Sequence, residues 1–230
     1  MKSVSNKINI NGYVNDEDIA NEIAVHFEKV FNSSDNEVAY NEYLHKRVEC
    51  MINDDLQSSY ECYDKVCLEQ IDKCLQKMKL GKACGPDDLS VEHLLHAHPS
   101  LIMHLQALFK LIILHGHVPT SFGIGVTIPL VKDKTGNFND VNNYRGITLS
   151  PVISKLFEIV LLEICDDVLH TDSLQFGFKE KVGSVDAIFT LRSTIEYFIN
   201  RGNSVSMASL DIRKAFDRVN HYKLYKSRLD

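Results

Sequence analysis

The stretch Ser209 to His221 reads SLDIRKAFDRVNH and places Asp211 and Asp217 on either side of a single phenylalanine. Residues 203–212 alternate between two faces, as a β-strand does, and are predicted to form one. A strand that ends here presents a carboxylate beside backbone carbonyls. Magnesium prefers such oxygen ligands, so Asp211 and the carbonyl of Ile212 are candidate Mg²⁺ ligands. On this stretch alone, Asp211 as the cap of a following helix fits equally well.

The residues before this stretch are predicted to be mostly helical. Apolar side chains recur at helical spacing over residues 19–31, 68–78, 101–113, 153–168 and 188–198. Turn and cap residues bound these segments, with Asn15 and Ser90 as predicted N-caps and Gly81 and Gly116 as predicted ends. Residues 125–133 alternate as a strand does, and Pro129 indicates an edge strand or an irregular pairing. The pattern predicts an α+β chain.

Charge is distributed unevenly along the 230 residues, whose net charge is -6. Residues 16–72 contain 15 acidic and 4 basic side chains, whereas residues 176–228 contain 10 basic and 5 acidic ones. A basic C-terminal part of this kind suits a phosphate backbone or a nucleotide. Two ordinary solvated faces would account for the same charges, so the charge pattern alone leaves both interpretations open.

Other composition features narrow the class of protein. No apolar run approaches the roughly 20 residues of a membrane-spanning helix, and the start lacks the apolar core of a signal peptide. We therefore expect an intracellular protein, in the cytoplasm or the nucleus, with no membrane partner. The six cysteines form no C-x-x-C pair, which predicts free thiols. His93, His96 and His98 are interpreted as surface and half-buried helix positions rather than zinc ligands.

Four motifs, in a fixed order, resemble the reverse transcriptases of non-LTR (LINE-type) retrotransposons. They are GKACGPDDL at 81–89, NNYRGITLSPVISKLFE at 142–158, QFGFKEKVGSVDAI at 175–188, and SLDIRKAFDRVNH. An ordered set is far more specific than one short pattern. Two positions depart from the family's usual residues: Gly146 stands where proline is usual, and Lys179 where arginine is usual. Within the second motif, Lys155 and Glu158 have the spacing of an intrahelical ion pair.

The resemblance implies a role for several residues. Asp211 would be a metal ligand, together with the carbonyl of Ile212. Phe216 would lie under the sugar and favour deoxynucleotides, although without the resemblance a core aromatic is the preferred interpretation. Arg145 would grip the incoming triphosphate, because its guanidinium fork matches phosphate oxygens. Lys132 would be its companion, less securely because the loop between the two varies in length.

The third motif implies contacts with the template strand. Gln175, Gly177, Phe178 and Lys179 would lie along it, and for the first three a structural role in packing the helix entry fits about as well. Asp217 is expected to support the turn after Asp211 rather than to bind metal.

The implied fold is a mostly helical, α+β fragment of a right-hand polymerase, with an incomplete palm and no thumb. Residues 1–75 would be an upstream helical and linker region, residues 76–202 the fingers, and residues 203–230 the first palm strand with the turn and helix after it. Two-metal phosphoryl transfer also needs an aromatic-x-Asp-Asp motif, and the acidic pairs of this chain all precede Asp211 without an aromatic at the required position.

Two functions from different classes remain open. In the first, the chain is part of an RNA-directed DNA polymerase whose parent uses Mg²⁺, an RNA template, a DNA primer and deoxynucleotides, and the isolated chain is inactive. In the second, it is a non-catalytic RNA-binding module that uses the basic residues Lys179, Lys181, Arg213 and Arg218. A helical scaffold without nucleic acid would leave the four ordered motifs as coincidence.

Overall fold

The computed structural model describes residues 8–31, 42–43, 45–47, 50, 63–166, 171–179, 181–212, 219–220 and 223–224. The chain divides into two compact units, one formed by Met1–Ile164 with Lys214–Asp230 and the other by Cys165–Arg213. The domain boundaries expected after residues 75 and 202, and the assignment of fingers and palm, stay predictions. The described helices include none that is long and apolar enough to cross a membrane.

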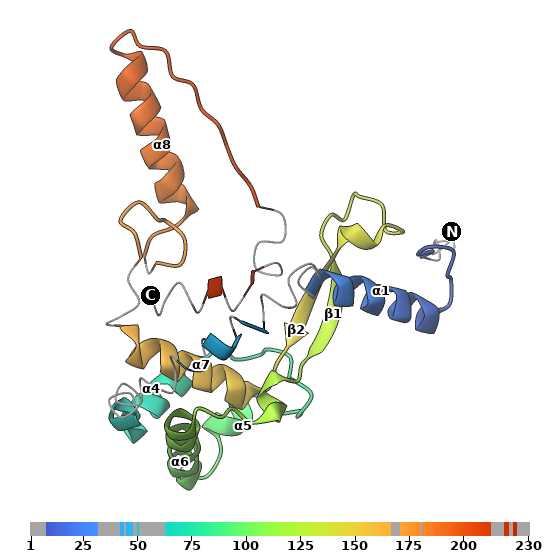
Figure 1. Ribbon diagram of the computed structural model, residues 1–230, viewed down its shortest axis with the longest axis vertical. Helices are drawn as coiled ribbons and strands as arrows, with labels where there is room; N and C mark the ends of the chain where they lie inside the picture. Colours follow the sequence, from blue (N-terminus) through green and yellow to red (C-terminus); the bar gives the residue numbers. More distant parts are fainter. Residues whose placement is uncertain are drawn as a thin grey trace. The chain divides into compact units, whose positions relative to one another are not determined.

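Six α-helices stand out among the described residues (Figure 1). The first unit contains α1 (Asp16–Phe31), α4 (Leu68–Lys77), α5 (Val91–Leu95), α6 (Ser100–His115) and α7 (Val152–Ile164), and the second contains α8 (Ser184–Ile199). The predicted helices and two predicted caps are confirmed, but two predicted ends are wrong: α4 ends at Lys77 rather than at Gly81, and α7 ends at Ile164 rather than at residue 168. The side chain of Asn15 accepts a hydrogen bond from the backbone N–H of Glu17 at 3.2 Å, and that of Ser90 accepts one from His93 at 3.4 Å.

The main hydrophobic core lies among α4, α5, α6 and α7. Side chains of α4 and α6 meet those of α7, and Phe109, Leu156 and Val160 are fully buried. The rings of Phe109 and Phe157 lie 5.0 Å apart between centroids, which joins α6 to α7. The apolar faces of the amphipathic helices predicted from the sequence therefore meet in this core.

An antiparallel hairpin precedes α7. Strands β1 (Val126–Val131) and β2 (Tyr144–Leu149) pair so that Val131 faces Tyr144 and Pro129 faces Gly146. The strand predicted over 125–133 is confirmed, and Pro129 lies in a two-stranded sheet, where each strand has a free edge. Its partner β2 falls within the second motif, for which the sequence analysis made no strand prediction.

Helix α1 packs across one face of the hairpin (Figure 1). Ile23 and Phe27 from α1 form a small core with Ile10 and Tyr144. A Cβ atom at Gly146 would lie 3.2 Å from Cε1 of Phe27 and 3.0 Å from Cγ2 of Thr127. The glycine that replaces the family's usual proline therefore allows a close approach of the helix to the sheet.

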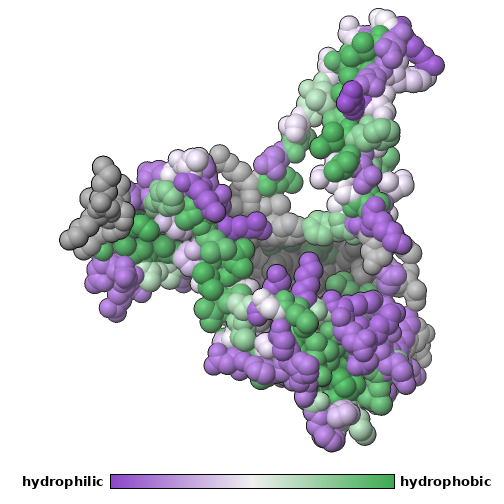
Figure 2. Space-filling view, turned by 180° about the vertical axis from the view of Figure 1, so that it is seen from behind, coloured by the Kyte–Doolittle hydropathy of each residue, from purple (hydrophilic) through white to green (hydrophobic). Residues whose placement is uncertain are grey.

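The described residues of the second unit form little hydrophobic core. Helix α8 contains no buried residue, and Ile188, Phe189 and Phe198 are all exposed. Figure 2 shows hydrophobic side chains on the surface of this unit. The strand predicted over residues 203–212 is wrong for this structure: these residues belong to no strand or helix, and all are exposed. A strand needs a ladder of partner hydrogen bonds, and the described residues provide none for this segment.

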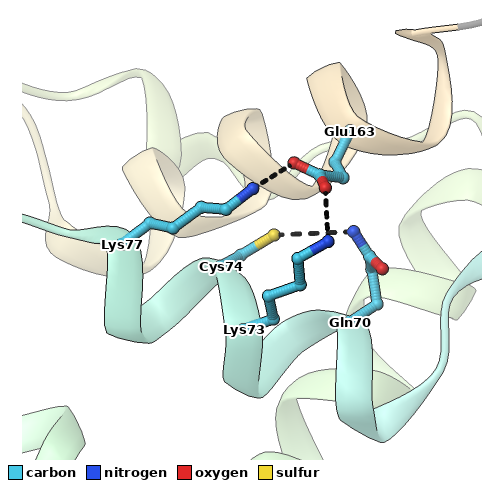
Figure 3. Close-up of polar contacts among 5 residues, drawn as sticks. All are labelled: Gln70, Lys73, Cys74, Lys77 and Glu163. Carbon is cyan, nitrogen blue, oxygen red and sulfur yellow. Dashed lines mark hydrogen bonds and ion pairs between the residues drawn. The ribbon is translucent and has the colours of Figure 1, made fainter.

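A carboxylate on α7 holds two lysines of α4 (Figure 3). Glu163 accepts hydrogen bonds from the ammonium groups of Lys77, at 2.7 Å, and Lys73, at 3.0 Å. These bonds, that of Lys77 first, lower the pKa of Glu163 to about 2. Between the two lysines in sequence lies Cys74, whose thiol pKa is raised chiefly by burial. Ion pairing thus adds to the apolar contact between the two helices.

The depressed pKa predicts how acid acts on the first unit. The ionised carboxylate stabilises the fold fully above pH 4.5, and this contribution is lost as the pH falls toward about 2. We expect Glu163→Gln to lower the melting temperature at pH 7 by on the order of 2 °C, since exposed ion pairs are weak. The difference from the unmodified chain should vanish near pH 2. Glu158→Gln, on the same helix, is the control, and an equal effect of the two substitutions would contradict the prediction.

A second constraint joins the loop before α5 to the turn after β2. A Cβ atom at Gly85 would lie 2.7 Å from the carbonyl oxygen of Ser150 and 2.9 Å from the nitrogen of Pro151. Both are backbone atoms, which cannot move aside as a flexible side chain can. The glycine of the Gly-Pro-Asp turn is therefore required by a close backbone approach.

This approach predicts that Gly85→Ala destabilises the fold by about 1–3 kcal/mol, the usual cost of overpacking. Chemical denaturation followed by circular dichroism measures the change. The matched control is Gly123→Ala, because a Cβ atom at Gly123 meets nothing within 4 Å. If the two substitutions had the same effect on the free energy of unfolding, the close approach would not be the cause.

Candidate functional site

The outer face of the hairpin carries two cations. Paired residues of an antiparallel ladder share a face, so Leu130 and Arg145 lie on the face opposite to Val131 and Tyr144, which meet α1. Lys132 follows in the same alternation, and its backbone N–H donates to the carbonyl of Asn143 at 2.7 Å. Lys132 and Arg145 are thus diagonal neighbours on one exposed face of the sheet.

The two cations differ in how they are held. The ammonium group of Lys132 donates to the backbone carbonyl of Asn142 at 2.8 Å. The side chain of Arg145 is exposed and makes no hydrogen bond or ion pair with any residue that the structure describes. A guanidinium without a protein partner retains all its donors for an anionic ligand.

The loop between the strands is ordered by its own hydrogen bonds. Asp133 accepts from the backbone and hydroxyl of Thr135 at 2.8 and 2.7 Å, and these bonds lower its pKa. The side chain of Asn143 donates to the carbonyls of Asp133, at 3.0 Å, and Asn137, at 3.2 Å. The hydroxyl of Tyr144 donates to the carbonyl of Phe138 at 2.8 Å. Together these contacts fix the conformation of the loop that follows Lys132.

Asp211 and Ile212 lie in the second unit, at the end of the exposed extended segment. The Asp211 carboxylate makes no hydrogen bond or ion pair within the described part of the chain. Within the same part, no three His, Cys, Asp or Glu side chains are grouped as a metal site requires. Phe216 and Asp217 lie outside the described residues, as do Arg213 and Arg218.

The predicted template residues form one tight turn in the second unit. The side chain of Gln175 donates to the carbonyl of Gly177 at 2.9 Å, and the ammonium group of Lys179 donates to the carbonyl of Asp172. Phe178 has a φ of 59° and is 86% exposed. A bulky residue at positive φ is uncommon, and an aromatic ring this exposed is not a core residue. Both interpretations of Phe178, contact with the template and packing of the helix entry, stay predictions.

The predicted residues thus gather into separate groups. Lys132 and Arg145 share a face in the first unit, whereas Asp211 and the turn at 175–179 belong to the second unit. The contacts described for each group are contacts within one unit.

The first unit also contains a basic pocket that was not predicted from the sequence. A cavity of about 400 Å³ lies between the loop at 78–90 and the start of α7, and its charged lining residues are Lys77, Lys79, Lys82, Lys155 and Glu158. The signal was present in the sequence as KMKLGK, three lysines within residues 77–82. The predicted pair of Lys155 with Glu158 is not formed among the described residues. Lys155 instead lines the pocket.

The chain is similar in sequence to curated proteins of mobile elements. It is 30% identical over 170 residues, 71% of the chain, to the RNA-directed DNA polymerase from mobile element jockey of Drosophila melanogaster. Over 186 residues, 77% of the chain, it is 26% identical to the protein of the same name from Drosophila funebris. It is also 26% identical over 166 residues, 72% of the chain, to the Retrovirus-related Pol polyprotein from type-1 retrotransposable element R2 of Popillia japonica.

The chain spans about one fifth of the length of these curated relatives, with 18%, 20% and 22% of their residues matched. No protein-family model matches it.

Proposed function

We propose that this chain, which belongs to the family of non-LTR retrotransposon reverse transcriptases, is a fragment of an RNA-directed DNA polymerase. It supplies residues that hold the incoming triphosphate and one carboxylate of the metal site. The parent adds deoxynucleotides to a DNA primer along an RNA template by two-metal phosphoryl transfer. The observation that carries this proposal is the pair of cations on the outer hairpin face.

Arg145 and Lys132 suit a triphosphate for different reasons. Arg145 offers a planar fork of donors, and its lack of a protein partner among the described residues leaves these donors available. Lys132 offers a compact charge close to the same face. In the reaction, the primer 3′-oxygen bonds to the α-phosphorus as the bond to pyrophosphate breaks. The two cations stabilise the negative charge that accumulates on the leaving pyrophosphate.

Asp211 and the carbonyl of Ile212 would hold a magnesium ion that neutralises phosphate charge. Oxygen ligands of this kind fit Mg²⁺, which completes its shell with waters and substrate oxygens. One carboxylate does not build a two-metal site, and no cluster of candidate ligands surrounds it among the described residues. Phe216 would select against a ribose 2′-hydroxyl, and Asp217 would support the turn. The turn at 175–179, from Gln175 to Lys179, would contact the template.

A second candidate function, RNA binding without catalysis, is favoured by Phe178. Its exposed ring lies next to Lys179 in sequence and three residues before Lys181. Aromatic rings flanked by basic residues suit single-stranded nucleic acid, because bases stack on the ring while the cations meet phosphates. This function requires RNA affinity that falls as salt rises.

Catalysis by the isolated chain provides one test. We expect the purified chain to add no deoxynucleotide to a DNA primer annealed to RNA in the presence of Mg²⁺, because the aromatic-x-Asp-Asp motif does not occur in its 230 residues. A full-length reverse transcriptase on the same primed template is the positive control. Extension by the chain that disappears in Asp211→Asn would show that this expectation is wrong.

Substitution of Arg145 tests the triphosphate site directly. We expect Arg145→Gln to weaken binding of a fluorescent deoxynucleoside triphosphate about tenfold, the usual scale for losing a charge-assisted hydrogen bond. Arg145→Lys should retain part of the affinity, because the charge remains but the fork is lost. Arg192→Gln is the control, since Arg192 pairs with Glu196 on α8. Equal affinity of Arg145→Gln and the unmodified chain would overturn the assignment, provided that the melting temperature is unchanged.

A further inference from the structure

The basic pocket of the first unit has a charge excess that the protein does not neutralise. Of its four lysines, Lys77 is held by Glu163 at 2.7 Å. The side chains of Lys79, Lys82 and Lys155 form no ion pair or hydrogen bond within the described part of the chain. Among the described lining residues, Glu158 is the only acidic one. The pocket therefore retains positive charge that an anion would neutralise.

The loop that carries two of these lysines is held at both ends. The backbone N–H of Gly81 donates to the carboxylate of Glu92 at 2.6 Å, and this bond is the main cause of the lowered pKa of Glu92. Gly81 has a φ of 68°, which glycine adopts without strain. At the other end, Gly85 lies against the backbone of Ser150. Because the loop is fixed in this way, it loses less conformational entropy when its lysines bind a ligand.

The interior of the pocket is apolar, unlike its charged rim. Leu89, Val91, Val152 and Ile159 contribute to the lining, and Lys155 is half-buried beside them. The volume of about 400 Å³ lies within the range of roughly 300–1,000 Å³ typical of ligand sites. Cations at the rim suit a phosphate, and an apolar interior suits the less polar faces of a nucleoside.

We propose that this pocket binds a nucleotide unit of single-stranded RNA, with the backbone phosphates at Lys82 and Lys155. The inference rests on the proposed function, because that function makes an RNA strand a partner of this chain. The site is distinct from the predicted template residues at 175–179, which belong to the other unit.

The test uses a fluorescent 12-nucleotide RNA and the full chain, with anisotropy measured from 50 to 300 mM salt. The double variant Lys82→Gln, Lys155→Gln should bind about tenfold more weakly. Its slope of log affinity against log salt should be smaller by about 1.4, because each single-strand phosphate contact contributes about 0.7. The control, Lys29→Gln with Lys46→Gln, removes the same charge from exposed lysines outside the pocket. Glu158→Gln should strengthen binding two- to threefold, a gain that misfolding does not produce.

Three outcomes would overturn the inference. The pocket and control variants could bind RNA equally well, or the unmodified chain could fail to bind the RNA at 50 mM salt. Uridine monophosphate could also displace the RNA at the concentration at which the nucleotide binds to the chain on its own, and the double variant could lose affinity for the nucleotide to the same extent. That result would make the pocket a site for free nucleotides. None of these outcomes affects triphosphate binding at Arg145, so failure of the pocket and failure of the proposed function are distinguishable.

Discussion

The packing of α7 against its neighbours is the constraint on which the first unit depends. Phe157 meets Phe109 of α6, and Leu156 and Val160 are fully buried. Only Ser150 and Pro151 separate α7 from β2. Burial of this helix therefore also fixes the position of the end of the hairpin. Glu163 strengthens the same contact by holding two lysines of α4.

The same short turn connects the two proposed binding features. The hairpin with Arg145 leads into the turn, and the pocket with Lys155 lies just beyond it. Gly85 makes its close approach at Ser150, so the lysine-bearing loop is also anchored there. If both proposed sites are correct, a single unit binds the triphosphate and one part of the RNA. Asp211 belongs to the other unit.

Helix positions were predictable because their signals are local. The caps at Asn15 and Ser90 and the left-handed Gly116 at the end of α6 depend on neighbours within a few residues in sequence. The family resemblance could also be recognised from the sequence, because the motifs and their order are features of the sequence itself. The ion pair between Lys155 and Glu158 was expected from spacing alone and does not form, because spacing does not decide which rotamers the surrounding contacts favour.

The sequence by itself determined the amphipathic helices, the strand around Pro129 and the identity of the cations at 132 and 145. Only the tertiary structure decided which face these cations share, because that follows from the register of β1 with β2. It also decided that Gly146 and Gly85 are sites of close approach and that dispersed lysines surround one pocket. Residues 203–212 show where a sequence pattern is not sufficient. They alternate as a strand does, but a strand forms only where another segment completes its hydrogen bonds.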